Sequence, residues 1–518
     1  MEDYKSSKYS QIEAVLKQHP GVRETAVVGW ESTVAGEHIV GYVVPNDDYV
    51  ALVPANAGGE GSLVRKWRTV FDIMQKGKEA AAAEPGFNIV SWNSSYTRQP
   101  IPFEQMRDWV ESTVTAISSL EPKEVLEIGC GTGLLLLRLA SKCRRYVASD
   151  FSSASLKQLA AQMEKLPGKW DAVTLSERLA DNFDGFPDDS FDTVIINSVA
   201  QYFPNVSYLT RVLEGAVNVT RPGGSIFIGD VRSLPLLEAF ALSVELFQAP
   251  PVLSAANLRE RVRRRVRQQE ELLLSPALFL ALQRRFPKVS GVKIAAKLGK
   301  FDNEMTCFRY DVTLQLGPDH NKSFELPWLN WAEQKLSLDA IRALLTTEKP
   351  DTLGIKAVPN SRIEKDVEAL AMLPTLGPSV TVGELRETLL SSPIRGLSPQ
   401  SLLALGEELG YEVELSWANS KTDGSYDSLF ERLRQGEQSP RRSIGWPQPE
   451  TLSEDLSEYA NNPARSALRR KLIPQLLEHA QEKLPPEMVP ASIVILDSLP
   501  LSATGQLDPQ ALPRPDLA

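Results

Sequence analysis

Apolar and polar positions along the chain predict strands and helices that follow one another. Residues 11–54 favour a helix, a strand (ETAVVGW), a charged turn and a second strand (HIVGYVVP). After a stretch rich in glycine and alanine, the central block places apolar strands before helical patterns, with strands expected at 124–129, 146–150, 192–199 and 225–231. Strand and helix units repeated in this way are typical of an α/β fold with a doubly wound sheet.

The pattern changes beyond these units. Residues 255–285 are helical and basic, a strand-rich segment starts at 292, and an acidic helical region extends to about 435. The last residues predict a helix, a proline-rich turn and a strand (ASIVILD). We therefore expect three segments: 1–54, 63–435 and 463–518. The central segment should contain a core at about 105–235 and a substrate or lid region at about 236–435.

Composition narrows the classes of function. The chain has 518 residues, with 56 Lys and Arg against 66 Asp and Glu, so its formal net charge is −10. A negative balance argues against binding along a nucleic-acid backbone, and we expect no nucleic-acid partner. Cys130, Cys143 and Cys307 lack a Cys-x-x-Cys spacing, which argues against a disulfide framework and a thiolate metal site. The sequence contains no export signal and no apolar run of membrane-spanning length, so we expect a cytoplasmic protein without a membrane partner.

A glycine-rich turn, EIGCGTG (127–133), joins the first central strand to the next helix. Glycines let the backbone turn tightly and let a ligand approach without a Cβ in the way. Asp150 ends the following strand, where a carboxylate can accept both hydroxyls of a ribose. Two alternatives to a ligand site exist. The glycines could serve only tight strand–helix packing, or the turn could be a degenerate copy of a binding site that binds no ligand.

The spacing of the glycines distinguishes two classes of cofactor. A dinucleotide site would use Gly-x-Gly-x-x-Gly against a pyrophosphate at a helix N-terminus. Here the glycines are Gly129, Gly131 and Gly133, and the acid Glu127 precedes them. A carboxylate repels a pyrophosphate but suits a cation, and S-adenosylmethionine carries a sulfonium and an ammonium. We expect S-adenosylmethionine as the cofactor.

Several runs together resemble a known family. VLEIGCGTG, SDFS, NSVAQYFP, RPGGSIFIGDVRSLPLLEAF and WNSSYTRQPIP look like the S-adenosylmethionine-dependent methyltransferase domains inserted in adenylation domains of nonribosomal peptide synthetases. NEMTCFRYDV (303–312) is similar to a motif of the N-methyltransferases in that group, although an amphipathic strand with core aromatics would give the same pattern. The flanks, QIEAVLKQHPGVRETAVV and LPPEMVPASIVILDSLPLSATGQLDPQALP, resemble the small C-terminal subdomain of the same synthetases.

The resemblance implies a Rossmann-like class I methyltransferase with extra helical and β lid regions, inserted in a split α+β adenylation C-terminal subdomain. It implies a phosphopantetheinylated carrier protein and neighbouring synthetase modules as partners. It also assigns the cofactor to Glu127, Gly129, Gly131, Gly133, Asp150, Phe151, Ala180, Asp181, Asn197 and Tyr96. The catalytic candidates are Glu304, Asn303, Tyr202, Gln201 and Asp230.

These candidates also have structural interpretations. Asn197 and Gln201 follow a core strand and either line the site or cap a turn. Asp230 could form an ion pair with Arg232, and Tyr96 could be a lid residue or core. The basic run 259–267 is either a solvated helix face or a docking surface for an acidic carrier protein.

The C-terminal run departs from the adenylation pattern. That family carries a lysine that contacts the acyl-adenylate, whereas this chain has Gln506, which cannot stabilise an anion as an ammonium does. The large adenylation core is also missing from the printed sequence. We therefore expect no adenylation activity from this polypeptide, whether it is a fragment or a pseudo-adenylation unit.

Histidine placement bears on which atom receives the methyl group. An α-amine beside a thioester is already partly neutral near pH 7, whereas a hydroxyl or a carbon acid needs a positioned base, most often His. None of the four histidines lies between residues 39 and 319. This favours methylation of nitrogen, with Glu304, Asp230 or Tyr202 as the other possible bases. O-methylation of a carrier-bound intermediate and a silent scaffold are the alternative functions.

Overall fold

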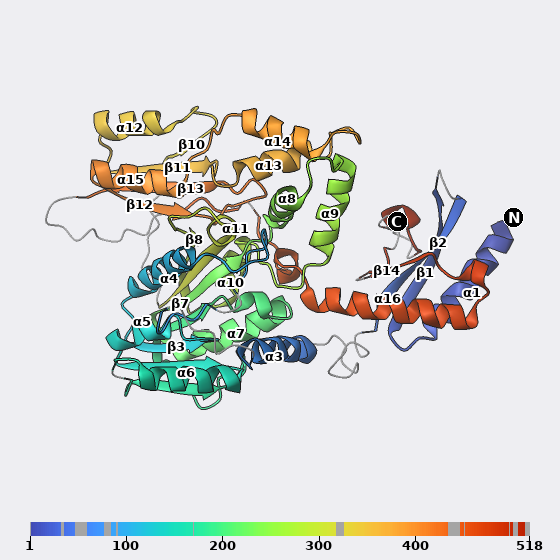
Figure 1. Cartoon of the computed structure of the whole chain (residues 1–518), viewed down its shortest axis with the longest axis horizontal. Coiled ribbons are helices and arrows are strands. Elements are labelled where there is room, and N and C mark those ends of the chain that lie inside the picture. Colours follow the sequence, from blue (N-terminus) through green and yellow to red (C-terminus); the bar gives the residue numbers. More distant parts are fainter. Residues whose placement is uncertain are drawn as a thin grey trace. The chain divides into compact units, whose positions relative to one another are not determined.

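The computed structural model divides the chain into two compact units. Met1–Lys66 and Asn462–Ala518 form the first unit, and Trp67–Asn461 form the second (Figure 1). The structure describes residues 2–32, 36–46, 60–76, 84–89, 92–168, 170–317, 326–433, 446–449, 451–496, 498–500 and 506–512. The stretch rich in glycine and alanine between the first two predicted segments, residues 55–62, has the composition of a linker and lies partly outside these residues.

The first unit is built from both ends of the chain. Its strands lie in the order β1-β2-β14, with β1 antiparallel and β14 parallel to β2. Ile12 and Leu16 from the N-terminal part share one apolar core with Leu472, Leu476 and Ile493 from the C-terminal part. Its elements are α1 (Glu2–Lys17), β1 (Val22–Ser32), β2 (Gly36–Pro45), α16 (Pro463–Lys483), η4 (Pro486–Met488), β14 (Ser492–Ile495) and η5 (Pro509–Ala511). Helix α3 (Glu60–Lys76) crosses the boundary between the units.

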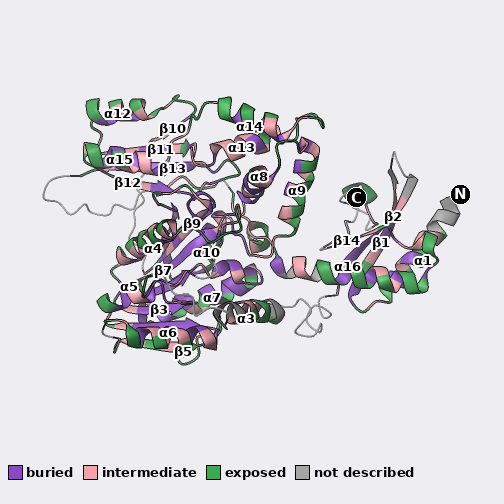
Figure 2. Cartoon of the chain, in the orientation of Figure 1, coloured by how far each residue is buried: buried purple, intermediate pink, exposed green. Residues whose placement is uncertain are grey.

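A seven-stranded sheet forms the centre of the second unit within the described residues. Its order is β5-β4-β3-β6-β7-β9-β8, in which β5 to β7 are parallel and β9 is antiparallel to both of its neighbours. Figure 2 shows buried residues concentrated in these strands. The strands are β3 (Glu124–Ile128), β4 (Arg145–Asp150), β5 (Val173–Glu177), β6 (Phe191–Asn197), β7 (Thr220–Arg232), β8 (Val289–Ala296) and β9 (Arg309–Leu316).

Helices cover this sheet because each has an apolar side. Side chains of α4, α5 and α6 share one core with β3 and β4, whereas α7 packs on β7 and α10 on β8. Polar caps start two of these helices: the Ser152 side chain accepts from Ser155 N, and Asn205 accepts from Tyr208 N. The elements are α4 (Phe103–Ser118), α5 (Leu136–Leu139), η1 (Ala140–Lys142), α6 (Ser153–Lys165), η2 (Ala200–Tyr202), α7 (Val206–Val219) and α10 (Ala277–Arg285).

A second layer of the same unit holds a four-stranded sheet in the order β10-β11-β13-β12. Its strands are β10 (Trp328–Asn330), β11 (Thr352–Val358), β12 (Tyr411–Ser416) and β13 (Tyr426–Arg432), with α12 (Leu338–Thr347) and α15 (Pro399–Leu409) beside them. Four further helices share one apolar core: α8 (Leu237–Gln248), α9 (Ala255–Arg267), α13 (Glu364–Met372) and α14 (Val382–Ser391). The short α11 (Glu304–Phe308) precedes β9, and η3 (Leu456–Tyr459) ends the unit.

The expected α/β fold with a doubly wound sheet is confirmed. The expectation of an acidic helical region up to about 435 was wrong in part, because β10 to β13 lie among its helices. These strands are short, and several mix charged with apolar residues, so their period is hard to distinguish from that of a helix. Among the described residues, no helix combines the length and the apolar character that a membrane crossing requires.

Candidate active site

The candidate residues gather at the edge where the parallel strands end. The glycine turn follows β3, Asp150 ends β4, Asn197 ends β6 and Asp230 lies near the end of β7. Because parallel strands end at the same edge, side chains from four separate parts of the sequence converge there. This edge of an open α/β sheet is where such folds bind ligands.

The glycine turn has a geometry that only glycine adopts without strain. Gly129, Gly131 and Gly133 have φ values of +76°, +53° and +80°. A Cβ on Gly129 would lie 2.4 Å from a methyl group of Val199, and a Cβ on Gly133 would lie 2.4 Å from a methyl group of Leu159. A Cβ on Gly131 would meet nothing within 4 Å. Gly129 and Gly133 therefore serve packing, whereas Gly131 faces open space that a ligand can use.

Two acids flank this turn, and both are buried. The Glu127 side chain is 3% exposed, and its Oε2 accepts a hydrogen bond from the Tyr146 hydroxyl at 2.8 Å. Burial raises the pKa of Glu127 to about 7. Asp150 accepts from Gly131 N at 2.9 Å and from Ser152 N at 2.8 Å. Burial raises the pKa of Asp150 as well, although these backbone hydrogen bonds oppose the rise.

Two amide oxygens at the same edge are buried without a hydrogen-bond partner among the described residues. They are Oδ1 of Asn197 and Oε1 of Gln201, on side chains that are 9% and 4% exposed. Unpartnered buried acceptors are costly, so a ligand with N–H or O–H donors would stabilise them. Together with the open space at Gly131 and the two acids, they fit a cationic nucleoside ligand such as S-adenosylmethionine.

The remaining cofactor candidates lie on neighbouring loops. Phe151 follows Asp150, and Ala180 and Asp181 lie in the loop after β5. The Asp181 carboxylate accepts from the Tyr208 hydroxyl at 3.0 Å, which ties this loop to α7.

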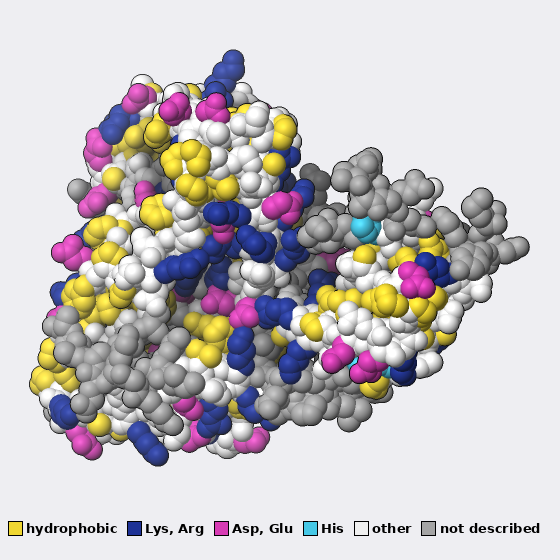
Figure 3. Space-filling model, turned by 45° about the vertical axis from the view of Figure 1, so that its right-hand side comes forward, with side chains coloured by type: hydrophobic (Ala, Val, Ile, Leu, Met, Phe, Trp, Pro, Cys, Tyr) yellow, Lys and Arg dark blue, Asp and Glu magenta, His cyan; other side chains and the backbone are white. Residues whose placement is uncertain are grey.

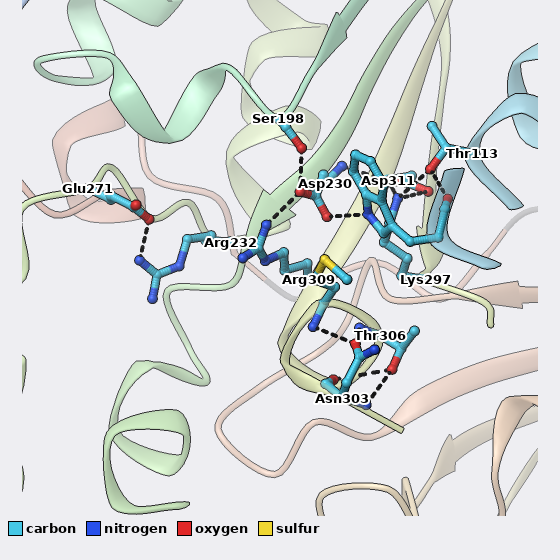
Figure 4. Close-up of polar contacts among 12 residues, drawn as sticks. Thr113, Ser198, Asp230, Arg232, Glu271, Lys297, Asn303, Thr306, Arg309 and Asp311 are labelled. Atoms are coloured by element: carbon cyan, nitrogen blue, oxygen red, sulfur yellow. Dashed lines mark hydrogen bonds and ion pairs between the residues drawn. The ribbon is translucent and has the colours of Figure 1, made fainter. Parts of the chain in front are cut away.

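Asp230 is the centre of a buried polar network (Figure 4). Its side chain is 0% exposed, and its carboxylate accepts from Arg309 Nη1 at 2.6 Å, from Trp109 Nε1 at 3.1 Å and from the Ser198 hydroxyl. Burial alone would raise the pKa of Asp230, but Arg309 and Lys297 with these hydrogen bonds hold it below its usual range. A carboxylate so stabilised is a poor proton acceptor, which weighs against Asp230 as a catalytic base.

The ion pair between Asp230 and Arg232, the structural alternative for these two residues, does not form. Arg232 instead donates to Glu271, while Arg309 takes the place next to Asp230 (Figure 4). Asp311 extends the network, because its carboxylate accepts from the Asp230 backbone N–H at 2.7 Å and pairs with Lys297 at 2.9 Å. The network therefore joins β7 to β9 at the point where both strands approach the site.

Asn303 has a structural position that the sequence motif did not reveal. It is the N-cap of α11, where it forms a capping box with Thr306, and its Nδ2 donates to Gln105 at 3.1 Å. The cap presents the next residue, Glu304, whose buried Oε1 accepts from Ser95 N at 2.9 Å. Asn303 thus fixes the start of the helix that carries Glu304.

The chain is similar to known proteins in two separate regions. Residues 126–226 match a family described as methyltransferase domain, and residues 11–67 match the AMP-binding enzyme C-terminal domain. The chain is 38% identical, over 98% of its length, to chondramide synthase cmdD of Chondromyces crocatus, and 30% identical, over 97%, to the nonribosomal peptide synthetase dtxS1 of Metarhizium robertsii. It spans 13% and 6% of the lengths of these two relatives.

The chain thus carries a methyltransferase domain together with a match to the AMP-binding enzyme C-terminal domain, and it is similar along nearly its whole length to segments of nonribosomal peptide synthetases. Among solved structures, N-methyltransferase NodS from Bradyrhizobium japonicum in complex with S-adenosyl-L-homocysteine is 14% identical. That match covers 48% of this chain and 98% of NodS, with a TM-score of 0.29.

Tyr96 anchors a loop of the methyltransferase domain to α8. Its hydroxyl lies 2.8 Å from the Ser243 hydroxyl, and its ring meets Phe240 and Phe247 edge-on. The Gln248 amide donates to the carbonyl oxygens of Ser95 and Tyr96. The loop that carries Ser95 and Tyr96 therefore contacts both α8 and Glu304. This position is compatible with a role of Tyr96 as a lid residue.

Tyr202 is held as a neutral phenol in the methyltransferase domain. Burial, with the negative charge of Glu271, raises the pKa of Tyr202. Its ring contacts Trp67, with 4.7 Å between the ring centroids. At neutral pH this hydroxyl is a hydrogen-bond donor and not a base.

Several residues near the site had no signal that identified them in the sequence. Trp67 lies on α3, where Asp72 also accepts from the Ser152 hydroxyl at 2.6 Å. Trp109 and Lys297 come from α4 and from the loop after β8, outside every recognisable motif. Arg309 does lie in the NEMTCFRYDV run, so its motif position could have identified it. Within the described ranges, no group of three His, Cys, Asp or Glu side chains offers a metal site.

The basic run 259–267 belongs to the amphipathic helix α9. Leu258 and Val262 are buried against the neighbouring helices, whereas Arg263 and Arg264 are exposed. Lys and Arg side chains gather on one face of the larger unit (Figure 3). Docking of an acidic carrier protein on this helix stays a prediction.

Proposed function

We propose that the methyltransferase domain methylates the α-amino nitrogen of an aminoacyl or peptidyl group held as a phosphopantetheine thioester on a carrier protein. Neighbouring synthetase modules would supply that carrier. The observation that carries this proposal is the buried carboxylate of Glu304, whose Oε1 accepts from Ser95 N and whose Oε2 accepts no hydrogen bond from any residue that the structure describes. It lies in a region without any histidine from residue 39 to 319.

The chemistry of an amine fits these residues. Methyl transfer from a sulfonium is an in-line displacement, so the protein mainly aligns the nucleophile in a site that excludes water. S-adenosylmethionine, when bound, supplies the electrophilic methyl group. An α-amine has a pKa of about 7.7–8.0, so it needs only modest help to become neutral.

The proposed roles follow from the contacts of each side chain. Asp150 would receive the ribose hydroxyls and Glu127 the ammonium of the cofactor, while Gly131 leaves room for it. Asn303 would position Glu304, and Glu304 would hold the substrate amine. Phe151, Ala180, Asp181 and Asn197 would line the cofactor site, Tyr96 would form part of the lid, and Tyr202 with Gln201 would close the substrate pocket.

Two carrier substrates test the nitrogen assignment. An aminoacyl carrier without a side-chain hydroxyl and a hydroxyacyl carrier without an amine are incubated with the protein and S-adenosylmethionine, and intact mass is measured. A gain of one methyl group on the aminoacyl carrier is expected. Methylation of the hydroxyacyl carrier alone would replace the proposal with O-methylation, and no binding of S-adenosylmethionine by calorimetry would favour a silent scaffold.

A variant pair tests Glu304. Glu304→Gln should lower turnover more than affinity for S-adenosylmethionine, because a group at the nucleophile is not part of the cofactor site. Glu407→Gln changes an exposed carboxylate on α15 and should leave both quantities unchanged. Equal losses of affinity and turnover in Glu304→Gln would place Glu304 in the cofactor site instead.

We further propose that this polypeptide forms no acyl-adenylate, because Gln506 stands where the adenylation pattern has a lysine. Amino-acid-dependent pyrophosphate exchange should stay at background. Exchange above background from the purified chain would contradict this part of the proposal.

A further inference from the structure

Helix α3 lies before the region that matches the methyltransferase family, yet its side chains reach the edge where the parallel strands end (Figure 1). On one side of the helix, the ring of Trp67 contacts that of Tyr202, with 4.7 Å between the centroids. Tyr202 ends η2, which follows β6. Trp67 is therefore held beside the residues that follow β6.

Another side of α3 contacts residues at the ends of β4 and β5. Asp72 accepts from the hydroxyl of Ser152, which follows β4, at 2.6 Å. Arg68 donates to Glu177, the last residue of β5, at 2.5 Å. Positions 68 and 72 are four residues apart and share one face of a helix, whereas position 67 points about 100° away from position 68. The helix therefore uses two different faces for the two flanks of the edge.

The end of β3 lies between these two sets of contacts. In the sheet order β5-β4-β3-β6, α3 contacts residues at β4 and β5 on one flank and beyond β6 on the other. The glycine turn follows β3, and a Cβ on Gly131 would meet nothing within 4 Å. A helix that is held on both flanks spans this end of β3, so it faces the open space at Gly131.

The Asp72 contact also acts on the ribose side of the site. Ser152 is 0% exposed, and its backbone N–H donates to Asp150 at 2.8 Å while its hydroxyl donates to Asp72. Asp72 therefore fixes the loop that presents Asp150. Burial chiefly raises the pKa of Asp150, and the charge of Asp72 adds to that rise.

The contacts of α3 suit a helix that can open. The side chains of Arg68 and Glu177 are 41% and 49% exposed, and an ion pair so exposed contributes little to stability. Trp67 and Asp72 are only half-buried. Segments that move for ligand exchange are drawn from the weakly held parts of a fold.

We propose that α3 covers the S-adenosylmethionine site, held there by Trp67 and Asp72, and moves away whenever cofactor and product exchange. This inference rests on the proposed cofactor site and adds to it a wall from outside the methyltransferase match. No covalent step is involved. The glycine turn and α3 would enclose the cofactor from opposite sides and exclude water, as methyl transfer requires.

Exchange kinetics test the cover. Tritium-labelled S-adenosylhomocysteine is bound to the full chain and chased with unlabelled ligand, and its dissociation rate is measured by rapid filtration. Trp67→Ala and Asp72→Ala should each raise this rate about tenfold, the size expected for losing an aromatic contact or a charge-assisted hydrogen bond. Thr69→Ala, at an exposed position of the same helix, should leave the rate unchanged.

Conservative variants separate the cover from a merely structural role. Trp67→Phe keeps a ring and Asp72→Asn keeps an acceptor oxygen, so each should raise the dissociation rate less than about threefold. The thermal midpoint without ligand should stay within about 2 °C of the unmodified chain in all of these variants. Faster release that always accompanies a lower midpoint would overturn the proposal in favour of a structural role.

A reversible bridge tests the movement itself. In the variant Arg68→Cys with Glu177→Cys, a bifunctional methanethiosulfonate reagent ties α3 to the end of β5, and reduction removes the bridge. The bridge should slow both binding and release of S-adenosylhomocysteine about tenfold or more, and dithiothreitol should restore both rates. The unmodified chain treated with the same reagent is the control. Equal rates with and without the bridge would show that exchange needs no movement of α3.

Failure of this inference differs from failure of the proposed function. If the unmodified chain binds S-adenosylhomocysteine and every variant releases it at the same rate, α3 is not the cover and the cofactor site survives. If the unmodified chain binds neither S-adenosylmethionine nor S-adenosylhomocysteine, the proposed function itself fails.

Discussion

Replacing Arg309 by methionine should destabilise the second unit strongly, because Asp230 would lose its main cation. The Arg309 guanidinium donates to Asp230 at 2.6 Å, and the Asp230 carboxylate is 0% exposed. Removing one partner of a buried ion pair costs about 3–5 kcal/mol, since the remaining charge stays buried without compensation. Ser198 and Trp109 would still donate to Asp230, so we expect a loss near the lower end of that range.

The reverse change should cost less. In Asp230→Asn the guanidinium of Arg309 remains, and the charges of Glu304 and Glu271 still favour its protonated form. We expect a loss of about 2–3 kcal/mol, from the weakened hydrogen bonds to Ser198 and Trp109. The free energy of unfolding of the double variant should fall no further than that of Arg309→Met alone. The coupling energy between Arg309 and Asp230 is then about 2–3 kcal/mol.

Urea unfolding followed by tryptophan fluorescence and far-UV circular dichroism measures all four proteins of this cycle at pH 7. The pH dependence gives an independent check. The pKa of Asp230 is held below its usual range, so its contribution is present at pH values above about 3.9 and disappears as the pH falls through the folded-state pKa. The ion pair would contribute little if the losses of unfolding free energy in the two single variants simply added up in the double variant. A loss below about 1 kcal/mol in either single variant would refute the prediction as well.

Three further predictions concern the cofactor edge. Gly133→Ala should destabilise the fold by about 1–3 kcal/mol in urea unfolding, because its φ is +80° and the new Cβ would meet Leu159, whereas Gly131→Ala should chiefly weaken S-adenosylmethionine binding in calorimetry. A larger stability loss for Gly131→Ala would contradict this division. Asp150→Ala should weaken binding by about ten- to a hundredfold through loss of a charge-assisted contact worth about 1.5–3 kcal/mol, and an unchanged Kd would exclude Asp150 from the ribose site. Affinity should rise as the pH passes about 7, where Glu127 ionises, and Glu127→Gln should remove that rise; the same pH profile in both proteins would rule out Glu127 as the titrating group.

Much of the cofactor edge could be predicted from the sequence because its signals are local. The turn after β3 needs glycines with positive φ, and those glycines alternate with other residues within one run of five, 129–133. Asp150 ends a strand whose apolar pattern is plain. The order of apolar strands and helices likewise indicated the doubly wound sheet, since period and turn residues depend on neighbours in sequence.

The substrate side depended on the tertiary structure. Asn303 looked like a substrate contact, but the fold uses it to cap α11, and Asp230 looked like a base, but Arg309 and Trp109 hold it as a structural anion. The hydrogen-bond partners of Asn303 and Asp230 come from residues far apart in the chain, which no local pattern records.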